Sequence, residues 1–433
     1  MSLTLIVEDN IQLQDFYHLN LYTWVGTGVI RAANAKFALE ELAERSSEIN
    51  LIITRVNIKT EKTFDAIQNY LDEHNLKIPI ITLGGTEDLG ETNIPSGIDI
   101  KLIVKAAARS LGVTAESMAA LQVEELFAIP IQHFNHLTFL ICEVFDGNSA
   151  QIYAADEMID PLKLKNDVAA GTLNYYVKRN SRLKFVSNFN EVIASKLNLL
   201  ELNKDEKIQA VELSQNLLRE NLEKFGVTEE NVELANRNLK EMVQNTRQTA
   251  SLLRFIKRLL KNKCGFHFKH TQVLMFVAAH LMDHLDWGTE EQKEKLQFIA
   301  YFHDIALEND EQARIHSNEE LMKSGIPAPK KELVKKHALL AASLVAQYPN
   351  APMGVEQIIK QHHGSLNGVG FSDHFSQNIS PMAIVLILAE DFVTDIIELG
   401  RDFSVGTKVA QMREKYTTQR FKKILDVLET ITA

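Results

Sequence analysis

Histidine is concentrated in one part of this sequence, together with acidic residues in apolar surroundings. Of the 14 histidines, ten lie between His267 and His374. Six side chains in that stretch stand out by their order and pairing: His270, His303, Asp304, His337, His362 and His363. A carboxylate in an apolar helix is costly unless it is paired or bound to a metal. Imidazole nitrogens and carboxylate oxygens together suit divalent ions, so these residues predict a metal centre.

Two carboxylate positions bear on how many ions such a centre holds. Asp304 follows His303 in the apolar run FIAYFHDIAL, and a carboxylate, unlike an imidazole, can bridge two metals. An acidic pair, Glu390 and Asp391, interrupts the apolar helical run PMAIVLILAEDFV, and either residue could complete the set. Two ions about 3.5–4 Å apart clamp a phosphate and activate a water molecule. We expect two divalent ions, Fe or Mn ahead of Zn or Ni, with Asp304 as the central catalytic residue.

The order His, His-Asp, His, His-His, carboxylate over residues 260–400 resembles the HD-GYP branch of the HD phosphohydrolase superfamily. The resemblance implies that His270 is the leading ligand and that Asp304 bridges the metals. The closing ligand of the family is the Asp of an AD-x-F segment. A gapless match puts Glu390 at that position, whereas Asp391 matches by residue type after a one-residue shift. The implied activity is that of a phosphodiesterase acting on cyclic di-GMP in bacterial signalling.

The resemblance fails at residues that would face the substrate. The family segment HHExxDGxGYP appears here as HHGSLNGVGFS, and HDIGK appears as HDIAL. The departures are Gly364 for Glu, Asn367 for Asp, Phe371 for Tyr, Ser372 for Pro, Leu307 for Lys, and Phe266 where members with three metals carry Glu. We expect Gly368 and Gly370 to let the backbone approach the substrate. The interpretation is an enzyme of weak or altered activity. The alternative is an inactive signalling adaptor that retains metal, with or without nucleotide binding.

The remaining histidines of the stretch have no place in this pattern. A single histidine in a helix is usually structural or solvated, and this is the expectation for His267, His280, His284, His316 and His374. His284 is the exception worth following, because fourteen residues past His270 it returns near the same helix face.

The first 115 residues alternate short apolar strands with amphipathic helices. Strands are expected near residues 3–7, 29–32, 51–54 and 78–83, and helices near 13–24, 35–45, 64–73 and 99–111. Alternating strand–helix units with continuously apolar strands predict a parallel sheet covered on both faces.

This α/β pattern resembles the receiver domain of response regulators, a flavodoxin-like fold. Receivers need an acidic pair after the first strand, which Glu8 and Asp9 supply, and an acceptor Asp at the end of the third, where Arg55 stands. Their hydroxyl and lysine positions hold Gly84 and Ser96. We therefore expect a degenerate receiver in which Arg55 forms an ion pair beside Glu8 and Asp9. The alternative is an unrelated α/β domain.

Two further regions complete a multi-domain chain. Residues 116–204 predict a small α+β module, and residues 205–433 predict a helical lead-in followed by an all-α HD-type domain. In the module, the run LTFLICEVF predicts a strand, DGN a turn and QIYAA the partner strand. The module has a slight resemblance to the α+β domains that precede some HD-GYP domains.

Bulk composition narrows the classes of partner. The formal net charge is −11 and no dense Lys/Arg block occurs, which argues against a nucleic-acid surface. The N-terminal apolar run is too short for a signal peptide, and no apolar stretch reaches membrane-spanning length. Cys142 and Cys264 form no metal-type pair, so a reducing cytoplasm is expected. The expected partners are a cyclic dinucleotide or related phosphoester, and a second copy of the chain or a signalling protein.

Overall fold

The computed structural model describes residues 2–85, 93–114, 125–247, 251–372 and 375–431. His374 lies outside these residues. The chain forms two compact units, Met1–Leu213 and Ser214–Ala433. Among the described helices, none combines the length and the apolarity needed to cross a membrane.

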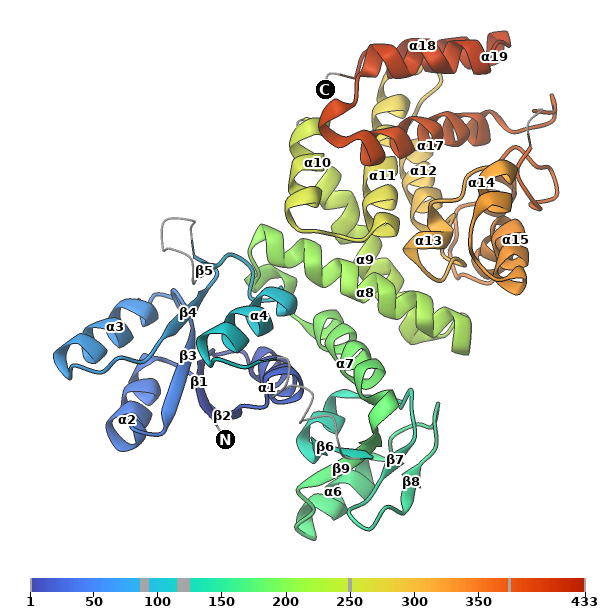
Figure 1. Cartoon of the computed structure of the whole chain (residues 1–433). Coiled ribbons are helices and arrows are strands. Elements are labelled where there is room, and N and C mark those ends of the chain that lie inside the picture. The colour runs from blue at the N-terminus through green and yellow to red at the C-terminus, as the bar shows by residue number, and fades with distance from the viewer. Residues whose placement is uncertain (1, 86–92, 115–124, 248–250, 373–374, 432–433) are drawn as a thin grey trace. The chain divides into compact units, whose positions relative to one another are not determined.

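The first unit begins with a five-stranded parallel sheet in the order β2-β1-β3-β4-β5. The strands are β1 (Leu3–Val7), β2 (Gly28–Ala32), β3 (Ile49–Arg55), β4 (Ile80–Leu83) and β5 (Asn93–Ile94). The helices are α1 (Ile11–Val25), α2 (Ala35–Arg45), α3 (Thr63–Glu73) and α4 (Ile100–Ser110). Figure 1 shows α1 with α4 on one face of the sheet and α2 with α3 on the other. The predicted parallel sheet is confirmed.

Local sequence accounts for where these elements begin and end. The side chain of Asn10 accepts hydrogen bonds from the backbone of Gln12 and Leu13 and so caps α1. Gly26 ends the same helix with φ of 70°, a left-handed conformation that glycine adopts without strain. The central strands β1 and β3 are buried along most of their length, because helices cover both faces of the sheet.

A second sheet lies in the same unit, in the order β6-β9-β7-β8 with antiparallel pairing. Its region contains β6 (Leu126–Pro130), the 3₁₀ helix η2 (Ile131–His136), β7 (Val144–Phe145), β8 (Gln151–Tyr153), α6 (Pro161–Ala169), β9 (Asn174–Lys178) and η3 (Arg179–Ser181). The predicted turn joins β7 to β8, and the Asp146 carboxylate accepts from the backbone of Asn148 and Ala150.

The strand predicted from LTFLICEVF is wrong for most of its length. Only Val144–Phe145 is a strand, and the preceding residues follow an irregular path. Leu140 and Ile141 are consecutive and both are buried, whereas a strand directs successive side chains to opposite faces. A continuous apolar run therefore marked burial here without marking extended structure.

Helices make up almost all of the described chain from α7 onward. In order they are α7 (Arg182–Lys196), η4 (Leu199–Glu201), α8 (Lys204–Phe225), α9 (Glu229–Arg247), α10 (Leu252–Lys261), α11 (Phe266–His284), α12 (Glu290–Phe302), α13 (Asp310–Ala313), α14 (Asn318–Lys323), α15 (Ala328–Val345), α16 (Val355–Gln361), α17 (Pro381–Leu399), η5 (Gly400–Asp402), α18 (Val405–Lys415) and α19 (Gln419–Leu428). In the second unit α11 packs against α12 and α17, and α15 packs against α16. The predicted helical C-terminal region is confirmed.

Candidate metal centre

Five packed helices bring the sequence-predicted ligands of the second unit together. His270 lies on α11, His337 on α15 and Glu390 on α17. The two adjacent pairs, His303–Asp304 and His362–His363, follow the last turns of α12 and α16. All of these side chains except His363 are at least nine-tenths buried as residues, and the His363 side chain is only 8% exposed. The centre is therefore a closed polar cluster inside an apolar helical core.

Asp304 lies at the middle of this cluster. One of its carboxylate oxygens is 3.1 Å from Nε2 of His303, and the other is 3.2 Å from Nε2 of His337 and 3.7 Å from Nε2 of His362. Two groups with metal-ligand spacing share it. They are His270–His303–Asp304 and Asp304–His337–His362–His363. A carboxylate shared by two ligand groups has the placement that bridging two ions requires.

Glu390 supplies the second carboxylate. Its Oε1 is 3.1 Å from Nε2 of His303 and 4.0 Å from Nε2 of both His270 and His362. Its Oε2 is 3.9 Å from Nδ1 of His363. Glu390 therefore faces histidines of both ligand groups.

Asp391 does not join the cluster. Its carboxylate contacts Nζ of Lys408 and Nζ of Lys415, each at 2.7 Å, and the Tyr416 hydroxyl at 2.6 Å. One residue along a helix turns the side chain by about 100°, so neighbours on α17 cannot both face the same point. The reading in which Asp391 closes the ligand set is corrected: the structure brings Glu390 to the histidines instead.

Backbone carbonyls orient three of the imidazoles. The Nδ1 atoms of His303, His337 and His362 lie 2.9, 2.6 and 2.6 Å from the carbonyl oxygens three residues before them. A carbonyl can only accept, so Nδ1 carries a hydrogen, and in the neutral imidazole Nε2 presents a lone pair to the cluster. A carbonyl partner of this kind typically orients metal-bound histidines.

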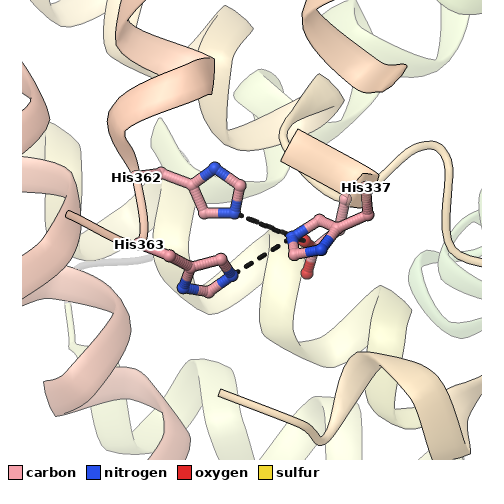
Figure 2. Close-up of side chains that lie close together, drawn as sticks. His337, His362 and His363 are labelled. Atoms are coloured by element: carbon pink, nitrogen blue, oxygen red, sulfur yellow. Dashed lines mark hydrogen bonds and ion pairs between the residues drawn. The ribbon is translucent and has the colours of Figure 1, made fainter. Parts of the chain in front are cut away.

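Nε2 atoms of neighbouring imidazoles lie in contact inside the cluster, an arrangement that a cation would stabilise. Nε2 of His337 lies 3.1 Å from Nε2 of His362 and 3.1 Å from Nε2 of His363, the two contacts drawn in Figure 2. His337 and His362 both hold their hydrogen on Nδ1, so in neutral form no hydrogen bond joins their Nε2 atoms. A positive ion between such lone pairs removes the repulsion.

Both ring nitrogens of His270 lack a hydrogen-bond partner among the described residues. Nε2 of His303, Oδ1 of Asp304 and Oε1 of Glu390 have as close contacts only one another, the second Asp304 oxygen and the neighbouring imidazoles. Buried polar atoms are normally paired, so a group of orphaned donor atoms indicates a missing partner. Nitrogen and oxygen atoms in this number fit divalent metal ions, and the residues present therefore fit the predicted cofactor.

The charges of the cluster are strongly coupled. Burial alone would lower the pKa of His303, but Asp304 and Glu390 outweigh it and raise that pKa to about 10. Burial would raise the pKa of Asp304, but His303 and its neighbours hold it well below the usual range. Burial keeps the pKa values of His270 and His363 well below 6.5, which leaves both imidazoles neutral. In the metal-free chain a proton on His303 thus supplies part of the missing positive charge.

The glycines predicted to face a substrate lie in a loop fastened to α15. The carbonyl of Gly368 accepts from the backbone of Leu339, and the backbone N–H of Gly370 donates to the carbonyl of Lys335. Both have positive φ, 75° and 71°. A side chain at Gly368 would press on the α15 backbone at 3.1 Å, so this position requires glycine for packing alone. The predicted role of these glycines in substrate binding remains a prediction.

Among the described histidines that were expected to be structural, two lie beside the centre: Nε2 of His267 is 3.2 Å from the backbone carbonyl oxygen of Asp304, and His316 packs against the ligand rings. Its ring lies 5.3 Å from that of His270 and 6.0 Å from that of His363. His280 and His284 stack on each other at 4.2 Å instead. Nothing in the sequence distinguished His316, because it lies outside the helices that carry the ligands.

The site in the first unit that was predicted to be a degenerate receiver site differs from its prediction in one partner. Arg55 forms an ion pair with Glu8 at 2.8 Å, as predicted, but Asp9 lies beside Lys59 at 3.5 Å. The second partner of Arg55 is Glu206 on α8, at 2.5 Å. Glu206 lies 151 positions away from Arg55, so no local pattern pointed to it.

The same helix continues to fill this end of the sheet. Glu206 accepts from the backbone of Gly97, and Gln209 accepts from the Ser96 hydroxyl. The carboxyl ends of the strands are thus occupied by side chains of α8.

Comparison with known proteins identifies the helical region. Residues 268–430 match the family model described as HD domain, so the chain carries an HD domain there. Among solved structures the chain is similar to Bd1817, a HDG"Y"P protein from Bdellovibrio bacteriovorus, at 16% sequence identity and a TM-score of 0.36. That comparison covers 70% of this chain and 99% of the other. No curated protein matches the chain.

Proposed function

We propose that the HD domain of this protein is a metal-dependent phosphodiesterase that holds two divalent ions, with Fe or Mn preferred over Zn or Ni. The ligands would be His270, His303, Asp304, His337, His362, His363 and Glu390. The observation that carries the proposal is the sharing of Asp304 by two ligand groups inside a closed core. When bound, the ions would neutralise a phosphodiester and lower the pKa of a water molecule.

Other features of the chain would orient the ligands and shape the surroundings of the substrate. Carbonyl-oriented imidazoles hold their Nε2 atoms inward, which keeps the ligand geometry prepared before any ion arrives. Phe371 packs its ring 4.6 Å from that of His363 and so places an apolar side chain beside the centre. Leu307 is buried and uncharged where the resembled family carries lysine. The metals would therefore carry the phosphate charge that this lysine carries in the resembled family.

The proposed substrate class is a cyclic dinucleotide, cyclic di-GMP first, or a related phosphodiester, with slow or altered turnover. A second candidate function is an inactive adaptor of the same signalling system, which the loss of Lys at Leu307 and of Glu at Gly364 favours. The two candidates differ in turnover and agree on metal content.

The test compares metal-loaded wild-type chain, purified without oxygen, with its Asp304→Asn variant on bis(p-nitrophenyl) phosphate and on cyclic di-GMP. The expected result is hydrolysis of the activated diester that Asp304→Asn abolishes, with much slower loss of cyclic di-GMP. Metal bound by the HD-domain ligands without hydrolysis of either diester would favour the adaptor. Fast hydrolysis of cyclic di-GMP would show that the missing side chains are not needed.

For the first unit we propose a receiver-like domain that no phosphoryl group can switch. The order β2-β1-β3-β4-β5 is that of flavodoxin-like folds, and this supports the proposal. Arg55 stands where an acceptor is needed, and a guanidinium cannot accept a phosphoryl group. The proposed role is constant contact, either holding two copies of the chain together or docking a signalling partner.

A further inference from the structure

A second histidine cluster lies in the first unit, far along the sequence from the HD domain. Four histidines fall outside the stretch 267–374, and three of them converge on one carboxylate. His18 and Asp15 lie one turn apart on α1, while His133 and His136 lie on η2. The cluster therefore joins a helix of the parallel sheet to the first turn after β6.

The distances within this cluster are those of a ligand set. Nδ1 of His133 is 3.6 Å from Oδ1 of Asp15, and Nε2 of His136 is 2.7 Å from Oδ2 of Asp15. The rings of His18 and His133 are 5.0 Å apart. One donor atom each from Asp15, His18 and His133 lies within 4.8 Å of the others. Two imidazoles and a carboxylate are a common donor set for divalent transition metals.

His133 is the side chain that lacks an explanation. It is fully buried, and neither of its ring nitrogens has a hydrogen-bond partner among the described residues. Leaving a buried polar atom unpaired costs roughly 1–3 kcal/mol, and here two such atoms belong to one ring. Oδ1 of Asp15, 3.6 Å from Nδ1 of His133, has the Arg31 guanidinium as its close contact, at 2.7 Å. An ion that took the place of this guanidinium would satisfy Asp15 and His133 together.

In this structure, Arg31 on β2 supplies the positive charge that neutralises the cluster. Its guanidinium is 2.7 Å from Asp15 and 2.6 Å from Nδ1 of His18. The guanidinium does not reach the nitrogens of His133, which stay unpaired. Arg31 is also a quarter exposed and lines a cavity of about 420 Å³ with Glu40, Glu41 and Glu44 among its other residues. If the Arg31 side chain rotated into this cavity, it would leave the cluster free for a metal ion. The glutamates of the cavity would still neutralise its guanidinium.

We propose that Asp15, His18 and His133, with His136 as a fourth donor, form a binding site for a divalent transition metal such as Zn²⁺, and that Arg31 is the competing cation. The site is independent of the HD cluster. Metal binding there fastens α1 to η2, so it stabilises the packing of the two sheet regions within the first unit. Burial and the neighbouring charges lower the pKa of His18 to about 4 and that of His133 to about 3, so both imidazoles are neutral and ready to bind.

The experiment is a Co²⁺ titration of the metal-free full-length chain, followed by visible d–d absorption and by elemental analysis after desalting. All variants carry Asp304→Asn, which weakens the HD cluster and leaves the second cluster to be counted. His133→Phe removes a ligand while filling its buried volume. Arg31→Gln keeps every ligand and removes only the competing charge.

The expected result is that adding His133→Phe to Asp304→Asn lowers the metal content by one ion per chain, and that adding Arg31→Gln tightens the binding of that ion roughly tenfold. Equal binding with and without His133→Phe would overturn the proposal, and so would an Arg31→Gln chain that binds no more tightly. If circular dichroism shows that His133→Phe does not fold, His18→Asn takes its place, because His18 is only partly buried. Loss of metal in that variant supports the site, and unchanged binding overturns it.

Discussion

Two buried groups of carboxylates in this chain obtain their positive charge in different ways. At the end of the parallel sheet, Glu8 and Glu206 share the guanidinium of Arg55. In the HD domain, Asp304 and Glu390 are surrounded by histidines, and no Lys or Arg of the described residues pairs with either of them.

The difference lies in what each partner can do next. A guanidinium stays protonated and has no lone pair, so it neutralises carboxylates and closes the site to metal ions. An imidazole held by its Nδ1 hydrogen keeps a lone pair on Nε2, so it needs a cation from solution. The first group is therefore complete within the chain, and the second is complete only with metal.

The largest expected effect separates the two acidic neighbours on α17. Glu390→Gln should weaken metal binding by about 100-fold or more, because it removes a carboxylate that faces both ligand groups. Asp391→Asn should leave metal content unchanged and lower thermal stability, since Lys408 would lose one of its two carboxylate partners. Elemental analysis and thermal unfolding of the two variants measure this. Equal loss of metal in the two variants would contradict this assignment, because it would mean that Asp391 also binds metal.

The next effect tests the guanidinium at the end of the sheet. Arg55→Met should lower the free energy of unfolding of the first unit by about 3 kcal/mol, because two buried carboxylates lose their counter-charge. Adding Glu206→Gln should recover part of this loss. Lys59→Met is the matched control, since its pair with Asp9 is exposed and is worth under about 1 kcal/mol.

Urea unfolding followed by Trp24 fluorescence, in a chain carrying Trp287→Phe, reports on the first unit. Equal destabilisation by Arg55→Met and Lys59→Met would mean that the buried ion pair contributes no more than an exposed one.

A smaller effect concerns pH in the first unit, measured on metal-free chain. The titrating groups are His18 and His133, which face Asp15, Arg31 and His136. Their pKa values are about 4 and about 3, against an ordinary value of 6.5. A lowered histidine pKa means that the unfolded chain binds protons first, so stability is full above about pH 6.5 and falls as the pH drops towards 4.

Each of these histidines contributes a slope of about 1.4 kcal/mol per pH unit within that window. His133→Phe should remove its share of the slope, whereas His74→Gln, at an exposed position, should leave it unchanged. If the wild-type chain, His133→Phe and His74→Gln all showed the same slope, the pH dependence would come from groups other than His133.

The smallest expected effect is no effect. Incubation with acetyl phosphate and Mg²⁺ should leave the intact mass of the chain unchanged, because Arg55 and Glu206 form an ion pair at the position that, in the proposed receiver-like domain, would otherwise bind metal and phosphoryl group. Mass spectrometry checks this directly. A phosphorylated aspartate within residues 1–115 would refute the closed site, and Asp9 would be the first residue to examine, because it lies outside the Arg55 ion pair.

Sequence by itself predicted the elements of the parallel sheet and the group of residues proposed as the main ligands. Continuous apolar strands between amphipathic helices were enough to predict the parallel sheet, since both periodicities are local. The six His and Asp residues of the HD cluster were recognisable by their order. Residue type and order along the chain can be compared with a known family without knowing how the chain folds. The buried stretch LTFLICEVF marks the limit of such patterns, since apolar runs indicate burial more directly than conformation.

Tertiary structure decided every choice that depends on how elements are turned or paired. Glu390 and Asp391 are equivalent in sequence, and only the rotation of α17 in its packed core determines which carboxylate meets the histidines. Glu206 reaches Arg55, and His133 reaches Asp15, across more than a hundred residues. Such partners leave no local trace, because a buried charge constrains only the chemistry of its neighbour and not the position of that neighbour along the chain.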